Sequence, residues 1–371
     1  MLCALDEIIV KPPQFEIVVD DNGNSVGEPV GVPIYLLLDI PSNTAAAYDL
    51  FRLPAFNEAL RALLNYWGEY LSDPNRDSNS SLNTGERGWF SAAGIKKLSE
   101  QGRIPDEPNG FIRTYVTPNA DPEQGFGFKS WDEFFVRKFQ PSARPLDIPD
   151  DPEIAATVIH SACESTVLRI STRVKKDDQF WLKGQPYSLY DMLIDERLAE
   201  QFKDGTIYQA FLGPQDYHRW HAPVDGRIVG ACVIQGSYYA VIPDAGAEIG
   251  DPDLKAGDPR GALIRSQPFL SLSATRAIIL IQADNPLIGL MCFVGIGMCE
   301  VSSCELSDKV KNKKNVKVGD ELGMFHFGGS SHVLIFNSES AIVFADNVIP
   351  DTHIKINSII AQVHEKPPDK K

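Results

Sequence analysis

Residues 321–336 read "ELGMFHFGGSSHVLIF", and the pattern of this stretch decides the fold class. A turn of two glycines and two serines separates the short apolar runs "MFHF" and "HVLIF". Short runs rich in Val, Ile and Phe, bounded by turn residues, are typical of β-strands. The same texture begins near residue 150 and recurs in "TVLRIS", "GTIYQAFL", "GRIVGACVI", "RAIILIQ" and "LIGLMCFVGIGM". The second part of the chain is therefore predicted to be rich in β-strands.

The turns between these runs favour antiparallel pairing. "VDG" at 224–226 and "VGDELG" at 318–323 have the composition of hairpin turns. The sequence has no regular alternation of strands and helices and no Gly-rich phosphate loop, so it does not predict a nucleotide-binding fold.

The first part of the chain has a different pattern. The first 40 residues are interrupted by Pro, Gly and Asp, which predicts an extended segment. Beyond residue 43, apolar residues recur at steps of three and four, which predicts an amphipathic helix, and "FSAAGIKKLSEQG" predicts another that ends at Gly102. We expect an α+β protein, with a helical accessory region over 1–125 and a mostly antiparallel, β-rich catalytic domain over 126–371.

Composition excludes several classes of function. The chain has 371 residues and a formal charge of −15, which argues against nucleic acid and anionic membranes as partners. No apolar run reaches the roughly 18 residues of a membrane span, and the N-terminus has no signal-peptide pattern. We therefore expect a cytoplasmic protein with no stable membrane insertion and six reduced cysteines.

Three segments carry groups that could do chemistry. "DYHRWHAPVDG" (216–226) contains His218 and His221, and imidazole is the usual acid or base near neutral pH. Without a third ligand nearby, the pair does not predict a metal site, and it could also be structural. "HSACESTVL" (160–168) contains Glu164, which is either an exposed carboxylate or the group that orients a histidine.

The third segment is the turn at Gly329 and Ser330. The Ser330 hydroxyl could attack the carbonyl carbon of Gly329, so that the amide becomes an ester, which elimination then cleaves. The serine would be left as dehydroalanine and hydrolyse to an N-terminal pyruvoyl group. A glycine before the serine would suit this reaction if the attack needs backbone room and unusual φ and ψ angles. The alternative is an ordinary flexible turn, since Gly–Ser turns are common.

Taken in order, these segments resemble the phosphatidylserine decarboxylase family of pyruvoyl-dependent enzymes. The resemblance covers about residues 130–371. It rests on "FFVRKFQPSARPL" (134–146), "SACES" (161–165), "KGQPYSL" (183–189), "YHRWHAP" (217–223) and "ELGMFHFGGSS" (321–331). The N-terminal part, with "RALLNYWGEYLSD" and "GERGWFS", further resembles a fungal branch that includes the L-tryptophan decarboxylase of psilocybin biosynthesis and ibotenate decarboxylase.

The resemblance implies a role for each candidate residue. Cleavage between Gly329 and Ser330 would turn Ser330 into a covalent pyruvoyl cofactor, and fragment 330–371 would stay with the rest of the chain. His221, oriented by Glu164, would deprotonate Ser330, and His218 would act at the substrate. The family usually has aspartate where this chain has Glu164, and glycine where it has Ser165.

The implied activity is removal of the α-carboxylate of a free amino acid through a Schiff base, with release of CO2 and an amine. We expect an aromatic or heteroaromatic substrate, with Tyr238 and Tyr239 of "QGSYYAV" (235–241) as a pocket wall, although such pairs also pack in cores. Three alternatives stay open. They are a phosphatidylserine decarboxylase, an uncleaved serine hydrolase that uses Glu164, His221 and Ser330, and an inactive binding protein that docks through "KVKNKKNVK" (309–317).

Overall fold

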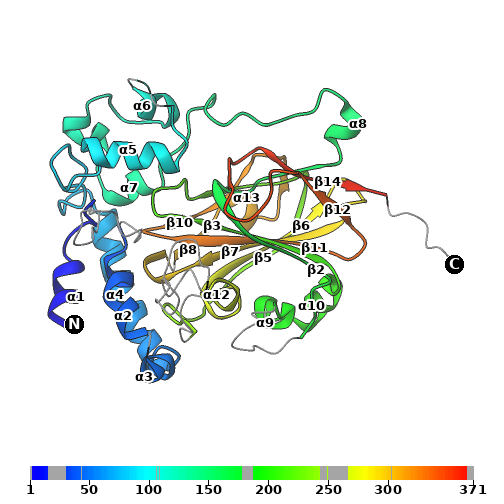
Figure 1. Cartoon of the computed structure of the whole chain (residues 1–371), viewed down its shortest axis with the longest axis horizontal. Helices are drawn as coiled ribbons and strands as arrows, with labels where there is room; N and C mark the ends of the chain where they lie inside the picture. The colour runs from blue at the N-terminus through cyan, green and yellow to red at the C-terminus, as the bar shows by residue number, and fades with distance from the viewer. Residues whose placement is uncertain are drawn as a thin grey trace.

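The computed structural model describes residues 2–15, 31–42, 44–105, 107, 109–177, 187–242, 249, 266–301 and 303–365. Helices of the first 135 residues gather at one side of the molecule, and the strands extend away from them (Figure 1). These helices are α1 (Leu2–Ile8), α2 (Pro33–Ser42), α3 (Ala45–Leu50), α4 (Pro54–Ser72), α5 (Ala92–Gln101), α6 (Gly110–Thr114), the 3-10 helix η1 (Pro122–Gly127) and α7 (Trp131–Phe135).

The two helices expected from periodicity are present as α4 and α5. Helix α4 begins at Pro54, where the missing N–H of proline costs no hydrogen bond. Its buried face carries Leu60, Leu64, Trp67 and Leu71, at the spacing that the sequence showed. Helix α5 begins after Ser91, whose hydroxyl accepts a hydrogen bond from the Gly94 N–H, and ends at Gly102 as expected.

The expectation of an extended N-terminal segment is wrong for residues 2–8 and 33–40. Residues 2–8 form α1, and residues 33–42 form α2. Proline at the first position of α2 starts this helix, and Ile34, Tyr35 and Leu38 bury its apolar side. Proline and glycine had suggested breaks, whereas here the proline marks the beginning of a helix.

Within the described residues the strands form three sheets, and every pair of neighbouring strands is antiparallel, so the predicted α+β class with an antiparallel core is confirmed. The largest sheet has eight strands, in the order β13-β2-β3-β11-β7-β6-β5-β9, and the others are β4-β10-β8 and β1-β14-β12. The strands are β1 (Val158–His160), β2 (Ser165–Thr172), β3 (Thr206–Leu212), β4 (Arg219–His221), β5 (Gly226–Ile234), β6 (Arg276–Ala283), β7 (Leu290–Gly297), β8 (Ser303–Leu306), β9 (Asn315–Val316), β10 (Glu321–His326), β11 (Ser330–Phe336), β12 (Ala341–Phe344), β13 (His353–Ile354) and β14 (Ile359–His364). Shorter helices connect them: α8 (Pro152–Ala155), α9 (Leu189–Leu193), α10 (Glu196–Phe202), α12 (Gln267–Ser273), η2 (Cys299–Val301) and α13 (Asp308–Lys311).

The two predicted hairpins are wrong. "VDG" joins β4 to β5 and "VGDELG" follows β9 and leads into β10, yet each of these pairs is divided between two sheets. The turns bond to each other instead, because the Asp225 carboxylate accepts hydrogen bonds from the Val318 N–H (2.8 Å) and from Lys317 Nζ (2.7 Å). The signal for a turn was correct, but the composition of a turn does not say which strands pair.

Strand β11, which begins at Ser330, lies at the centre of the largest sheet. All seven of its residues are buried, and it pairs with β3 on one side and β7 on the other. The segments that follow it add β13 to the same sheet and β12 and β14 to another. Residues 330–365 are thus built into two sheets rather than attached at the surface.

The helical side and the sheets share one continuous hydrophobic core. The rings of Trp89 and Trp131 lie 4.9 Å apart across the predicted boundary near residue 125. A Cβ added to Gly68 on α4 would lie 2.9 Å from the ring of Phe327, three residues before Ser330. The helical part therefore packs against the Gly–Ser turn, and a division of the chain at residue 125 stays a prediction.

The lysine-rich segment 309–317 is engaged within the molecule. Lys309 pairs with Asp320 (2.7 Å), Lys317 with Asp225 (2.7 Å), and Lys311 lies 3.9 Å from Glu305. These contacts favour a solvated loop over a docking surface. Among the described residues, no helix combines the length and the apolar character that crossing a membrane requires.

Candidate active site

The structure brings Ser330 and His218 together inside the protein. Ser330 Oγ lies 3.2 Å from Nδ1 of His218, and neither residue is exposed to solvent. Strand β11 places the serine, while His218 directly precedes β4 in the adjacent sheet. The ring of Phe135 stacks on the imidazole, with 4.2 Å between ring centroids, and so fixes the plane of His218.

The hydrogen bonds of His218 determine which ring nitrogen can act as a base. Its Nε2 lies 2.9 Å from the carbonyl oxygen of Gly213, which can only accept, so Nε2 carries the proton. Nδ1 therefore keeps its lone pair and accepts the hydrogen bond from the Ser330 hydroxyl. Burial, and then the charge of Arg137, lower the pKa of His218 to about 3. At neutral pH the site holds an uncharged imidazole directed at a serine hydroxyl.

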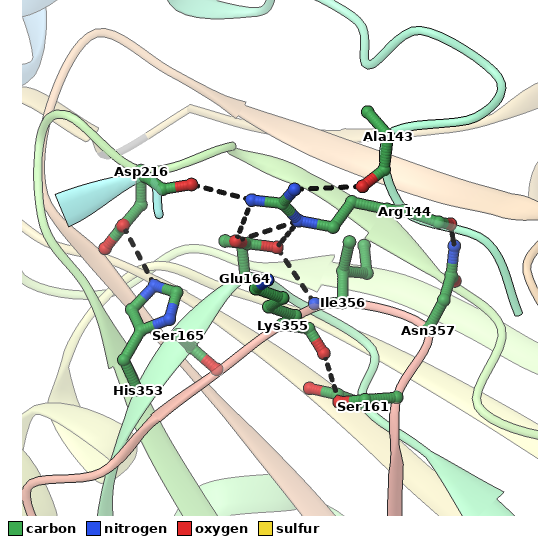
Figure 2. A network of polar contacts seen from close by, with 12 residues as sticks. Ala143, Arg144, Ser161, Glu164, Ser165, Asp216, His353, Lys355, Ile356 and Asn357 are labelled. Atoms are coloured by element: carbon green, nitrogen blue, oxygen red, sulfur yellow. Dashed lines mark hydrogen bonds and ion pairs between the residues drawn. The ribbon is translucent and has the colours of Figure 1, made fainter. Parts of the chain in front are cut away.

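The loop that holds His218 is itself held by charged groups. The Asp216 carboxylate accepts a hydrogen bond from the Gly213 N–H (2.7 Å), and the Arg137 guanidinium donates to the carbonyl of Gln215 (2.7 Å). On its other side Asp216 faces His353, with 3.5 Å between Oδ1 and Nε2 (Figure 2). The loop that carries the Gly213 carbonyl is thus held at two points.

Glu164 forms a buried ion pair with Arg144 (Figure 2). The guanidinium donates from Nη2 to Oε1 (2.7 Å) and from Nε to both carboxylate oxygens, at 3.1 and 3.0 Å. The backbone N–H of Ile356 also donates to Oε2 (2.9 Å). Glu164 is completely buried, so these hydrogen bonds replace the contacts with water that its carboxylate lacks.

His221 belongs to the same polar network, but among the described residues it forms no hydrogen bond with Ser330. Its Nδ1 lies 3.4 Å from Oδ1 of Asn357, and its Nε2 lies 3.2 Å from the Tyr217 hydroxyl. The amide of Asn357 donates to the carbonyl of Arg144 (2.9 Å). Glu164 is thus linked to His221 through Arg144 and Asn357, whereas the sequence suggested a direct contact.

The backbone of the turn differs from expectation in one respect. Gly329 does not have a positive φ angle, and an added Cβ would meet its neighbours at 3.8 Å or more, which is ordinary contact distance. The unusual conformation lies at Phe327, whose φ of +82° is in the left-handed region that side chains disfavour. Local strain is therefore stored two residues before Gly329.

The two tyrosines that were expected to line a pocket have different environments. The Tyr238 hydroxyl donates to Oε1 of Gln235 (2.8 Å) at the wall of a cavity. Tyr239 is fully buried, and its ring packs edge-on against Phe51 at 4.9 Å. Tyr239 lies between the helical region and the sheets and does not line any described cavity. Of "KGQPYSL", residues 183–186 lie outside the described residues.

Sequence reasoning did not identify several residues that hold the site together. Arg137 and Arg144 are the two arginines of "FFVRKFQPSARPL", and Asp216 stands two residues before His218. The sequence did contain a signal for the two arginines. A charged residue inside an apolar, aromatic stretch is expected to be buried, and a buried charge needs a partner. Nothing in the sequence near Asn357 indicated its contact with His221. No group of three or more His, Cys, Asp or Glu side chains suited to a metal ion occurs in the described part of the chain.

Comparison with known proteins agrees with this geometry. Residues 131–362, which include Ser330, His218 and Glu164, match the family model described as phosphatidylserine decarboxylase. Residues 1–98 match a second model with that description. The chain belongs to the phosphatidylserine decarboxylase family.

Individual relatives extend the match to nearly the whole chain. Decarboxylase iboD of Amanita muscaria is 50% identical over 97% of this chain and 99% of its own length. An L-tryptophan decarboxylase of Psilocybe cyanescens is 35% identical over 91% of this chain and 75% of its own length. Phosphatidylserine decarboxylase proenzyme 3 of Schizosaccharomyces pombe is 32% identical over 63% of this chain and 21% of its own length. The predicted family is confirmed, and the chain is a decarboxylase, a carboxy-lyase.

The Glu164–Arg144 pair makes a prediction about stability. In a Ser330→Ala background, Glu164→Gln leaves the Arg144 charge buried without its partner, and we expect a loss of about 3 kcal/mol in unfolding free energy. Glu107→Gln is the control, because its ion pair with Arg113 (2.9 Å) is exposed and should change stability by less than about 1 kcal/mol. Urea unfolding followed by fluorescence measures both. Equal losses for the two variants would contradict the account.

His332 makes a prediction about pH. It is fully buried between the rings of Phe293 and Tyr208, burial lowers its pKa to about 3, and neither ring nitrogen has a hydrogen-bond partner among the described residues. The unfolded chain takes up a proton near pH 6.5, so the folded state loses stability as pH falls below that value. His332→Leu should reduce this slope by about 1.4 kcal/mol per pH unit, measured by urea unfolding between pH 7.5 and 5. An unchanged slope would show that His332 is already protonated in the folded protein.

Proposed function

We propose that this chain is a self-processing, pyruvoyl-dependent decarboxylase that removes the α-carboxylate of a free amino acid. One observation carries the proposal. The Ser330 hydroxyl directly follows Gly329 and lies 3.2 Å from an uncharged, buried histidine. A serine in a central strand has no evident structural need for such a base, whereas a serine that attacks its own peptide bond does.

The proposed cleavage uses atoms of this chain and one water molecule. A base removes the hydroxyl proton, Ser330 Oγ bonds to the Gly329 carbonyl carbon, and the C–N bond breaks to leave an ester. Removal of the Ser330 α-proton then breaks the Cβ–Oγ bond, which releases residues 1–329 with a C-terminal carboxylate. The dehydroalanine at residue 330 tautomerises to an imine, and water releases ammonia and leaves a pyruvoyl group. Strain at Phe327 would be relieved when the turn opens.

The surroundings of residue 330 fit a pyruvoyl group. Its carbonyl would supply an electrophile for the substrate amine and an acceptor for the electron pair that CO2 leaves behind. His218 keeps a lone pair at this position and is placed to receive and return a proton there. The pairing of β11 with β3 and β7 keeps the small fragment and its new end in the sheet. Burial of the site limits the access of bulk water during the proton transfer.

The family resemblance and the geometry point to different bases for the cleavage step. The resemblance implies His221, with Glu164 as its orienting carboxylate, and His218 as the residue that acts on the substrate. The geometry favours His218, because it contacts the Ser330 hydroxyl while both ring nitrogens of His221 have other partners. In either case Glu164 and Arg144 hold the segment that carries Asn357, and through it His221.

A free amino acid is the substrate class that the relatives support best. The L-tryptophan decarboxylase matches 91% of this chain, and the match to the phosphatidylserine decarboxylase proenzyme covers 63%. We therefore place this chain with the decarboxylases of aromatic or heteroaromatic amino acids, with phosphatidylserine as the second candidate. An uncleaved serine hydrolase is a third, since Ser330 and His218 are in contact. Complete burial of Ser330 in the intact chain argues against it.

The mass of the denatured protein tests the cleavage. We expect wild-type protein to give two species, residues 1–329 and residues 330–371 with a blocked N-terminus, which elute together before denaturation because β11 is paired on both sides. Ser330→Ala removes the nucleophile and should remain one chain of 41.0 kDa. Ser331→Ala is the matched control and should be cleaved. A wild-type protein that stays at 41.0 kDa would refute the proposal.

Separate substitutions of the two histidines identify the base. In cell-free synthesis, we expect His218→Asn to slow cleavage by 100-fold or more, roughly the contribution of one general base, because it removes the group in contact with Ser330. His221→Asn should be cleaved faster than His218→Asn, since it removes contacts to Tyr217 and Asn357 and leaves His218 in place. Cleaved but inactive His218→Asn together with uncleaved His221→Asn would reverse this assignment.

A further inference from the structure

A polar cavity of about 470 Å³ lies where the helical region meets the sheets. Helix α4 forms one wall, and β5, β8 and the end of β10 with their adjoining loops form the rest. The polar residues of its lining are Arg61, Asn65, Gln235, Tyr238, Glu300, Ser303, Glu305 and His326. The proposed cleavage does not involve the residues that line this cavity.

The cavity borders both segments that adjoin the cleavage site. Glu300 stands three residues after Gly297, which pairs with Ser330 across the sheet, and His326 stands four residues before Ser330. Three residues of extended chain reach at most about 10 Å, so the Glu300 backbone lies within that distance of Gly297. The cavity wall therefore lies close to the strands that carry Gly297 and Ser330.

A buried carboxyl group forms part of the cavity wall. Glu300 is 2% exposed, and its Oε1 accepts a hydrogen bond from the N–H of Tyr35 on α2 (2.8 Å). Its Oε2 has no hydrogen-bond partner among the described residues. Burial raises the pKa of Glu300, which favours the neutral form that can donate a hydrogen bond. An unsatisfied polar atom in a cavity is a position for a ligand atom.

The lining also carries a positive charge, that of Arg61 on α4. Arg61 lies beside the Tyr238 hydroxyl, and its charge and hydrogen bond act on that group. His326 and Glu305 already have charged partners, since Nε2 of His326 lies 3.2 Å from Glu305 and its Nδ1 lies 2.8 Å from Asp132. No ion pair joins Arg61 to a carboxylate in the described part of the chain. The guanidinium is therefore the charge of the cavity that is left for a ligand.

We propose that this cavity binds the substrate side chain and selects one that is acidic and accepts hydrogen bonds, such as a carboxylate or an acidic heterocycle. The proposal rests on the proposed function, because it assigns the substrate class of that site. Arg61 would bind the anionic group, and Glu300 would donate to a neighbouring acceptor. An indole has one N–H donor and no anionic group, so it would leave Arg61 unpaired in this cavity.

The position of Arg61 in the sequence agrees with a role in specificity. It lies within residues 1–98, apart from the 131–362 range that matches the phosphatidylserine decarboxylase model with the cleavage site. The match to phosphatidylserine decarboxylase proenzyme 3 of Schizosaccharomyces pombe covers 63% of this chain, which is too little to include all of residues 1–98 and all of residues 131–362. The cavity thus combines residues of the part that contains the cleavage site with residues of the helical part.

Binding of unreactive probes tests the proposal. Glutarate and indole-3-propionate have no amine and cannot condense with the protein, and calorimetry with the purified full chain measures their binding. We expect glutarate to bind more tightly than indole-3-propionate, and Arg61→Gln to weaken glutarate binding by about tenfold or more. Arg76→Gln is the control, because this exposed arginine pairs with Asp73 at 3.2 Å and does not line the cavity. Glu300→Gln, which keeps a donor, should bind glutarate better than Glu300→Ala does.

The outcomes separate this inference from the proposed function. Tighter binding of indole-3-propionate, no binding of either probe, or glutarate binding that Arg61→Gln leaves unchanged would overturn the inference, even if the chain is cleaved at residue 330. Glutarate binding that depends on Arg61 in a chain that is not cleaved would support the cavity and refute the pyruvoyl proposal.

Discussion

The contact between Ser330 and His218 is the constraint on which the rest of the structure depends. A serine at the start of a buried central strand meets this base because a second sheet brings the histidine to it. The β4-β10-β8 sheet does so, because β4 directly follows His218 and pairs with β10, which leads into the turn before Ser330. The nucleophile and the base therefore come from strands that are close in space and about a hundred residues apart in sequence.

Buried charged residues, which are stable in an apolar core only with partners, keep the contact between Ser330 and His218 in place. Arg137 and Asp216 hold the loop whose carbonyl directs the proton of His218. Arg144 and Glu164 form a separate buried pair that fixes the segment carrying Asn357. Each charge has a partner, since an unpaired one would cost several kcal/mol. The charged groups thus hold the segments that orient the two histidines, while burial is the main reason that the pKa of each histidine is lowered.

The sequence predicted the antiparallel strands, helices α4 and α5, and the segments that meet at the site, because periodicity and turn composition are local. It did not predict the pairing at the two expected hairpins, where Asp225 bonds to another turn. It also did not show that His218 rather than His221 contacts Ser330, since that choice depends on the crossing of two sheets. Glu164 was expected to contact His221 directly. In the structure Arg144 and Asn357 lie between these two residues, and no local sequence pattern indicates that arrangement.

Reductive trapping tests the central claim most directly. Purified protein is treated with an amino acid and borohydride, digested, and the modified peptide is located by mass spectrometry. The account predicts that the amine is held covalently on the first residue of fragment 330–371, and that Ser330→Ala gives no adduct. A protein with an intact serine at position 330, or an adduct at any other residue, would contradict it.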